Sequence, residues 1–130
     1  MIKKKVKNGL VETAIDAMKH SHSPHSKFRV GAALEAASGR VYKGTNIEFD
    51  AYTLTVCAER AALFNAISNG EKDFVSLAIA TSSSEFKYPC GLCRQALVEF
   101  NPDLKLLLIT KTRKTKSVIL KDILPKYFKL

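Results

Sequence analysis

The run Phe74-Val75-Ser76-Leu77-Ala78-Ile79-Ala80 is apolar at nearly every position. A continuous apolar run of this length is typical of a strand that is buried on both faces of a sheet. The run from Leu104 to Ile109 has the same character. Each run follows a stretch with apolar residues at helical spacing, over 57–69 and 91–100. The alternation of helices with buried strands predicts an α/β fold whose sheet is at least partly parallel.

Further elements flank this central region. The segment 21–26 is rich in turn formers and predicts a loop, and Ser38-Gly39 predicts a turn that joins two strands into a hairpin. In chain order we expect a helix over 6–20, strands over 28–36 and 40–43, a short strand over 118–120, and a short helix over 122–128 interrupted at Pro125.

Length and composition predict one domain over residues 1–130, of which 46% are hydrophobic. We find no pattern of a signal peptide and no apolar run of the roughly 20 residues that span a membrane. We therefore expect a soluble, cytoplasmic protein. The net charge is +9, but the lysines are scattered apart from dense runs at 3–7 and 111–116. The second run has no aromatic residue for base stacking, which favours a solvated surface over a nucleic-acid partner.

The three cysteines lie in two short motifs, Cys57-Ala58-Glu59-Arg60 and Pro89-Cys90-Gly91-Leu92-Cys93. In a reducing compartment this spacing favours a metal site over a disulfide framework. Both motifs precede helical patterns, and a helix N-terminus favours thiolate, the form that binds Zn²⁺. Three ligands leave one position open, as in catalytic zinc sites. The alternative is a closed structural site whose fourth ligand is one of the histidines, His20, His22 or His25.

Glu59 favours the catalytic interpretation, because a carboxylate beside such a site can carry protons. Its simpler interpretation is an acidic residue in the first turn of a helix. Cys57 and Glu59 border one cavity only if the helix begins at Cys57, since residues i and i+2 do not share a helix face. Three thiolates on Zn²⁺ leave a net negative charge, which we expect Arg60 to offset. Arg94, next to Cys93, is either a second such cation or surface charge.

The order Cys-x-Glu followed by Pro-Cys-x-x-Cys is the signature of zinc-dependent deaminases. The chain resembles the small homo-oligomeric cytidine deaminases over nearly its whole length. The resemblance implies a three-layer α/β/α sandwich with a five-stranded mixed sheet. It also implies one Zn²⁺ per subunit and a homo-oligomer, usually a tetramer. It rests on four stretches: Phe28-Arg29-Val30-Gly31-Ala32-Ala33-Leu34, Asn46-Ile47-Glu48, Cys57-Ala58-Glu59-Arg60 and Pro89-Cys90-Gly91-Leu92-Cys93-Arg94-Gln95.

The resemblance also implies a function and a set of site residues. The reaction is hydrolytic deamination of cytidine and deoxycytidine to the uridines with release of ammonia, in pyrimidine salvage. The implied roles are zinc binding by Cys57, Cys90 and Cys93, proton transfer by Glu59, and charge neutralisation by Arg60. For the substrate they are ribose binding by Asn46 and Glu48, stacking by Phe28, base-edge contact by the backbone at Ala58, and closure of a neighbouring subunit's pocket by Phe128.

Each substrate residue also has a simpler interpretation. Phe28 could belong to the core, Asn46 and Glu48 to a turn and a solvated surface, and Phe128 could pack on its own chain. The chain departs from the pattern of many family members at His25, Arg29, Phe49 and Asp50, which concerns substrate range more than reaction type. Competing functions are deamination of another cytosine compound such as blasticidin S, deamination of polynucleotides, and a structural-zinc interaction protein. A polynucleotide enzyme needs a channel for flanking nucleotides, for which 130 residues leave little chain.

Overall fold

The structure is a computed structural model that describes the backbone of residues 4–130 and the side chains from residue 9 onward. It contains three α-helices, five strands and two short 3₁₀ helices. In chain order these are α1 (Lys4–Met18), β1 (Val30–Ala36), β2 (Val41–Thr45), η1 (Tyr52–Leu54), α2 (Ala58–Ser68), β3 (Phe74–Thr81), α3 (Gly91–Val98), β4 (Lys105–Ile109), β5 (Thr115–Ile119) and η2 (Leu120–Ile123).

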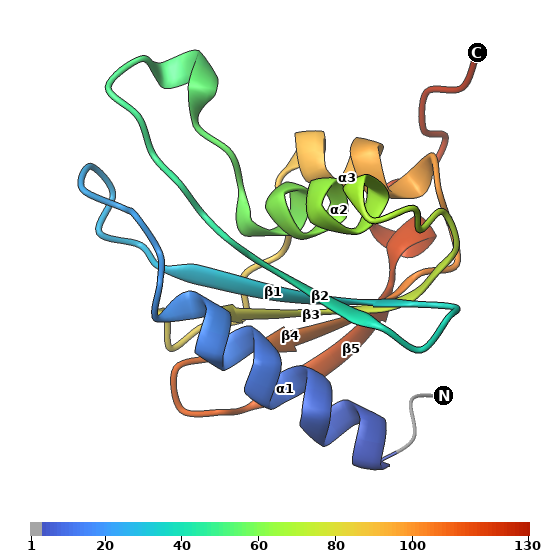
Figure 1. Cartoon of the computed structure of the whole chain (residues 1–130), viewed down its shortest axis with the longest axis horizontal. Helices are drawn as coiled ribbons and strands as arrows, with labels where there is room; N and C mark the ends of the chain where they lie inside the picture. Colours follow the sequence, from blue (N-terminus) through green and yellow to red (C-terminus); the bar gives the residue numbers. More distant parts are fainter. Residues whose placement is uncertain (1–3) are drawn as a thin grey trace.

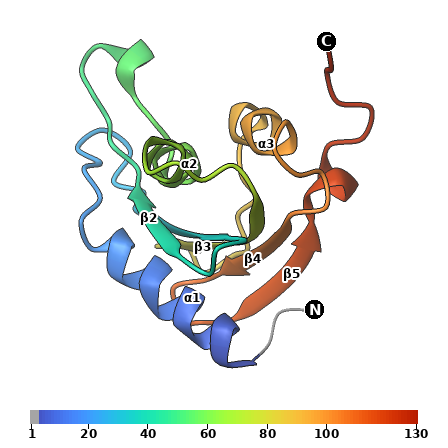
Figure 2. The ribbon, with the colours of Figure 1, turned by 45° about the vertical axis from the view of Figure 1, so that its right-hand side comes forward.

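The five strands form one mixed sheet in the order β2-β1-β3-β4-β5. The central β3 and β4 are parallel, and the other neighbours pair antiparallel. Helix α1 covers one face of the sheet, and α2 and α3 lie side by side over the other (Figures 1 and 2). The predicted α/β fold with a five-stranded mixed sheet is confirmed. Across residues 4–130, none of the helices combines the length and the apolar character that a membrane crossing requires.

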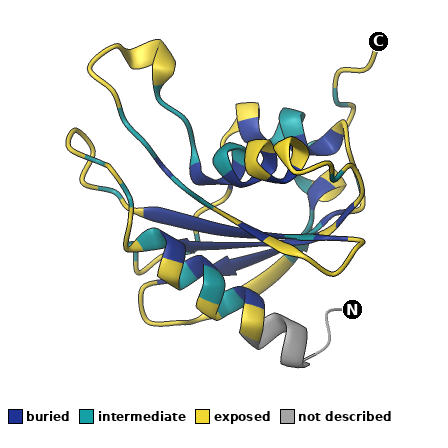
Figure 3. Cartoon of the chain, viewed as in Figure 1, coloured by how far each residue is buried: buried dark blue, intermediate teal, exposed yellow. Residues whose placement is uncertain are grey.

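Each face of the sheet has its own core. The strands β1, β3 and β4 are buried along most of their length, whereas the edge strands β2 and β5 are largely exposed or half-buried (Figure 3). Leu77 and Ile79 of β3 belong to the larger cluster under α2 and α3, whereas Ala78 and Ala80 of the same strand belong to the cluster under α1. This alternation follows from the period of two along a strand. The face under α1 carries mainly small side chains on β1 and β3, so α1 approaches the sheet closely.

Two glycines permit the closest approaches of helix to sheet. A Cβ at Gly31 of β1 would lie 2.1 Å from the carbonyl oxygen of Ala14 in α1. A Cβ at Gly44 of β2 would lie 2.2 Å from the amide nitrogen of Ala62 and 2.4 Å from the carbonyl oxygen of Ala58, both in α2. The absence of a side chain at Gly44 therefore sets the position of the first turn of α2.

Several element boundaries differ from those predicted, and the C-terminal helix over 122–128 is wrong. Only the 3₁₀ helix η2 forms there, because Leu124 precedes a proline and has a non-helical ψ of 66°, and Lys126 has a φ of +53°. The first strand begins at Val30 rather than at Phe28. The last strand, β5, is longer than predicted because it is an exposed edge strand whose first residues are polar and therefore carry little apolar signal.

Candidate active site

The sulfur atoms of Cys57, Cys90 and Cys93 lie within 4.8 Å of one another. Cys57 Sγ is 3.6 Å from Cys90 Sγ, and Cys90 Sγ is 3.5 Å from Cys93 Sγ. Tetrahedral Zn–S bonds of about 2.3 Å place sulfur atoms about 3.8 Å apart. The three thiols therefore fit one Zn²⁺ and can supply three of its four ligands.

Two helix starts position these cysteines. Cys57 is the N-cap of α2 and Cys90 is the N-cap of α3, and both have extended backbone conformations with ψ of 154° and 166°. Cys93 lies in the first turn of α3 and is buried. Helix α2 starts at Ala58, so Cys57 stands outside the helical spacing, and Cys57 and Glu59 line the same pocket. The helix therefore begins where it must for Cys57 and Glu59 to border one cavity.

The surroundings of Cys57 favour its thiolate. The Cys93 thiol donates a hydrogen bond that lowers the pKa of Cys57 to about 5, and Arg60 adds a smaller lowering. The same contact with Cys57 raises the pKa of Cys93. Arg60 Nη2 lies 3.7 Å from Cys57 Sγ. Arg60 Nε is buried and has no hydrogen-bond partner among the described residues, so this guanidinium faces the sulfur cluster with donor capacity to spare.

Glu59 lies beside the sulfur cluster and is only 5% exposed. Burial, with a smaller contribution from the negative charge of Cys57, raises its pKa to about 7. A carboxyl group with such a pKa exchanges protons readily at neutral pH, as a general acid and base must. In the first turn of a solvated helix, an ordinary acidic side chain would be exposed. The burial of Glu59 therefore favours the catalytic interpretation over the simpler one.

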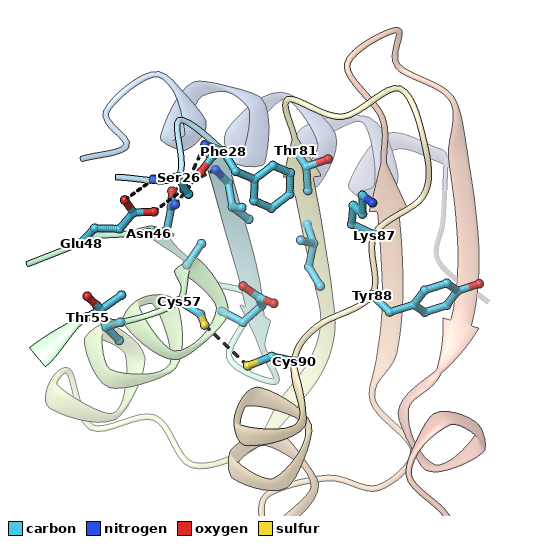
Figure 4. Close-up of a pocket in the computed structure, with 15 residues that line it drawn as sticks. Ser26, Phe28, Asn46, Glu48, Thr55, Cys57, Thr81, Lys87, Tyr88 and Cys90 are labelled. Atoms are coloured by element: carbon cyan, nitrogen blue, oxygen red, sulfur yellow. Dashed lines mark hydrogen bonds between the residues drawn. The ribbon is translucent and has the colours of Figure 1, made fainter. Parts of the chain in front are cut away.

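A pocket of about 320 Å³ opens above these residues (Figure 4). It is lined by side chains from the loop before β1, from 46–48, from the starts of α2 and α3, and from the end of β3. Cys57 and Cys90 lie on one side and Phe28 on the other, with Glu48 at one end and Lys87 at the opposite end (Figure 4). The volume suits a small molecule. The pocket thus brings together Phe28, Asn46, Glu48, Cys57, Ala58, Glu59 and Cys90.

Asn46 holds the chain at the point where β1 begins. Its Oδ1 accepts hydrogen bonds from the Val30 amide at 2.9 Å and from the Ser21 hydroxyl, and its Nδ2 donates to the Phe28 carbonyl at 2.7 Å. These contacts turn Phe28 out of the strand and into the pocket. The second Nδ2 hydrogen of Asn46 has no partner among these contacts.

Glu48 is held by the loop that precedes Phe28. Its carboxylate accepts hydrogen bonds from the His25 and Ser26 amides, both at 3.0 Å, and from the Ser26 hydroxyl. The Ser26 hydroxyl contributes most to lowering the pKa of Glu48. Glu48 is therefore ionised at neutral pH. Three hydrogen bonds hold its carboxylate at the pocket rim, which distinguishes it from an acidic side chain that is only solvated at the surface.

Phe128 lies away from the pocket of its own chain. It is 67% exposed and belongs to residues 124–130, which follow η2 without regular secondary structure. This exposure argues against packing on its own core. In Figure 1 this segment leaves the molecule beside α3. Its proposed position in a neighbouring pocket stays a prediction.

The histidines proposed as a fourth ligand lie elsewhere. In the part of the chain whose side chains are described, the metal-binding group contains the three cysteines and no histidine. His25 instead lies with its Nε2 3.1 Å from Asp50 Oδ1. With Phe49, His25 lines a second cavity of about 210 Å³ beside the first.

The sequence motifs did not identify several residues that line the pocket. Thr81 and Ile79 lie near the end of β3, and Thr55 and Val56 precede Cys57. The end of a buried strand next to a helix start was the available signal for Thr81. Lys87 and Tyr88 lie in the loop before Cys90 and have no pattern that marks them as pocket residues.

Comparison with known proteins agrees with this geometry. A family model described as the cytidine and deoxycytidylate deaminase zinc-binding region matches residues 4–108. A cytidine deaminase of Halalkalibacterium halodurans is 40% identical over 120 residues, covering 92% of this chain and 91% of that protein. A probable cytidine deaminase of Dictyostelium discoideum is 37% identical over 119 residues, covering 91% and 80%.

Solved structures show the same relationship. The crystal structure of cytidine deaminase from Burkholderia pseudomallei has a TM-score of 0.89 at 35% identity, covering 93% of this chain and 98% of that one. That of Mycobacterium tuberculosis has a TM-score of 0.82 at 35% identity, covering 95% and 98%. With the zinc-binding geometry of its three cysteines, these similarities show that the chain belongs to the cytidine deaminase family of zinc hydrolases.

Proposed function

We propose that the protein hydrolyses cytidine and deoxycytidine to uridine and deoxyuridine, releases ammonia, and serves pyrimidine salvage in the cytoplasm. The observation that supports this most is the arrangement of one pocket. A three-thiol zinc site and the buried Glu59 border the same cavity, Phe28 faces it from the other side, and Glu48 lies at one end (Figure 4). A pyrimidine nucleoside needs the zinc site and Glu59 for the reaction at its base, and Phe28 and Glu48 for binding of the base and the sugar.

Bound at the three thiols, Zn²⁺ would lower the pKa of a water ligand and so supply a nucleophile near neutral pH. Glu59 accepts a proton from the attacking water and delivers it to the pyrimidine N3. It then accepts the proton of the hydroxyl group added at C4 and delivers it to the amine, which departs as ammonia. Its raised pKa suits both directions of transfer. The Arg60 guanidinium, 3.7 Å from Cys57 Sγ, offsets part of the thiolate charge.

The rest of the pocket selects the substrate. Phe28 stacks on the pyrimidine, and the backbone at Ala58 contacts the base edge. The ionised Glu48 accepts a hydrogen bond from the ribose 3′-hydroxyl, and Asn46 donates its remaining Nδ2 hydrogen to the same group. Because Asn46 also holds Phe28 and Val30 in place, it contributes to both ends of the substrate.

A substrate panel with metal analysis tests this function. We expect zinc-loaded protein to convert cytidine and deoxycytidine with one ammonia released per uridine formed. Free cytosine should have a kcat/KM at least about a hundredfold lower, because it leaves Glu48 and Asn46 without their hydroxyl partner. Turnover of blasticidin S but not of nucleosides would identify the other small-molecule deaminase. Turnover only of a single-stranded oligonucleotide would contradict the proposal.

We further propose that the protein acts as a homo-oligomer, most simply a tetramer, in which Phe128 of one subunit closes the pocket of its neighbour. Phe128 is exposed, as are Tyr52 and Leu54 on the protruding loop after Glu48 (Figure 3). Exposed large apolar side chains of this kind support contact with another subunit. Light scattering should show an oligomer, and Phe128→Ala should raise KM more than it lowers kcat. A monomer with full activity would remove Phe128 from the site.

A further inference from the structure

Arg94 makes contacts that neither charge neutralisation nor surface solvation explains. Its Nε donates a hydrogen bond to the carbonyl of Pro89 at 2.7 Å, and its Nη1 donates to the carbonyl of Ile123 at 2.8 Å. Both bonds are short for N–H···O contacts and involve a charged donor, which makes them stronger than neutral ones. The guanidinium thus joins two chain segments that are far apart in sequence.

The two segments joined by Arg94 matter for the site. Pro89 immediately precedes the zinc-binding Cys90, at the end of the loop 82–90, which we call the Cys90 loop. Ile123 is the last residue of η2, and the residues after it, 124–130, form what we call the C-terminal tail. Arg94 therefore ties the start of the tail to the backbone beside a metal ligand.

Few other contacts hold the tail. Leu124 and Tyr127 pack against the larger core cluster, and Gln95 Nε2 donates to the Phe128 carbonyl at 3.2 Å. Gln95 is the neighbour of Arg94 in α3, so this helix holds the chain both directly before the tail, at Ile123, and within it, at Phe128. Because the tail has no regular secondary structure of its own, its direction depends on these side-chain contacts.

We propose that Arg94 is a positioning residue that fixes the direction in which the C-terminal tail leaves the Cys90 loop, and so the place to which Phe128 is delivered. It acts through the tail rather than through the charge of the thiolates. This inference rests on the proposed function, in which Phe128 closes a neighbouring pocket. A guanidinium suits the task because its rigid fork offers donors in two directions, which the single ammonium of lysine does not reproduce.

The first test measures the tail without using activity. Trypsin can cleave after Lys126 and Lys129 in the tail, and mass spectrometry gives the rate of each cleavage. We expect Arg94→Ala and Arg94→Lys to speed both cleavages about tenfold relative to the unmodified protein, the effect of losing one charge-assisted hydrogen bond. The matched control is Arg113→Ala, which removes an exposed arginine paired with Glu12 of α1 and should leave the rates unchanged.

The second test uses steady-state kinetics with cytidine. Arg94→Ala and Arg94→Lys should retain zinc and raise KM about tenfold, with a much smaller change in kcat. A chain that ends at Leu124 should show the same rise in KM, and Arg94→Ala should add nothing to it, because both changes remove the same delivery of Phe128.

Three results would overturn the proposal: tail cleavage at the unmodified rate in both Arg94 variants, recovery of KM by Arg94→Lys, or a full Arg94→Ala effect in the shortened chain. Recovery of KM by Arg94→Lys would show that Arg94 acts through its charge. A full Arg94→Ala effect in the shortened chain would show that Arg94 acts on the Cys90 loop and not on the tail. If the unmodified protein deaminates no nucleoside, the proposed function fails, whereas the cleavage rates still decide whether Arg94 directs the tail.

Discussion

Glu59→Ala should leave zinc bound at one ion per subunit while kcat for cytidine falls by about a thousandfold. Residues that transfer protons in the reaction typically contribute 10²- to 10⁴-fold to the rate. Glu59 should lie toward the upper part of this range, since it is proposed to serve both N3 and the leaving amine. Zinc content by metal analysis and uridine formation by absorbance measure the two halves of the prediction.

Glu59→Gln is the matched variant, because the amide has nearly the same size but cannot carry the proton. We expect it to lose turnover nearly as completely and to bind substrate with little change. Glu71→Gln is the control for a change of charge. Glu71 accepts hydrogen bonds from Ser38 and Tyr42, and neither residue lines the pocket. Normal deamination by Glu59→Ala would show that the proposed mechanism is wrong.

Gly44→Ala should lower the free energy of unfolding by about 3 kcal/mol, the upper part of the range for overpacking a core. The added Cβ would lie 2.2 Å from the Ala62 nitrogen and 2.4 Å from the Ala58 oxygen. Both atoms belong to the backbone of α2, so relief requires movement of the helix. Such a movement would displace Cys57 and Glu59, and the folded variant should also lose zinc affinity. Chemical denaturation and zinc titration with a competing chelator give the two quantities.

Gly31→Ala is the matched control for this prediction. Its Cβ would lie 2.1 Å from the Ala14 oxygen and 2.3 Å from the Met18 nitrogen, so it intrudes on a helix backbone to the same degree. The helix is α1, however, on the face of the sheet away from the zinc site. We expect a similar loss of stability with zinc affinity preserved in the folded protein. Equal zinc affinities in the two variants would contradict the role of Gly44.

The order of helices and buried strands was predictable because the signals are local and strong. The continuous apolar run 74–80 indicated a buried strand, and apolar residues at helical spacing over 57–69 indicated α2. Edge strand β5 was predicted too short, because an exposed strand has no need of the apolar residues that reveal a buried one. The composition of residues 122–128 allows a helix, but Pro125 removes a backbone donor, and the structure has no helix beyond Ile123.

The site was predictable where its chemistry follows directly from the residue types and their spacing. Three cysteines and a glutamate at fixed spacing indicate a metal and a proton carrier, and the structure brings these residues together. Lys87 could not be predicted as a pocket residue, since its position depends on how the Cys90 loop folds. The contacts of Arg94 were equally hidden, because one of its two carbonyl partners, that of Ile123, lies 29 residues further along the chain.

The hydrogen bonds around Glu48 have a consequence for the thermodynamics of binding. The loop 21–28 and the segment 46–48 are already joined through the Glu48 carboxylate and the Asn46 amide before any sugar arrives. Ordering a flexible loop would otherwise cost about 1–2 kcal/mol of backbone entropy per residue at the moment of binding. Here that entropy is lost during folding instead. The rim should therefore keep the same shape with and without substrate. The proposed hydrogen bond between Glu48 and a substrate hydroxyl should then lose little affinity to loop ordering.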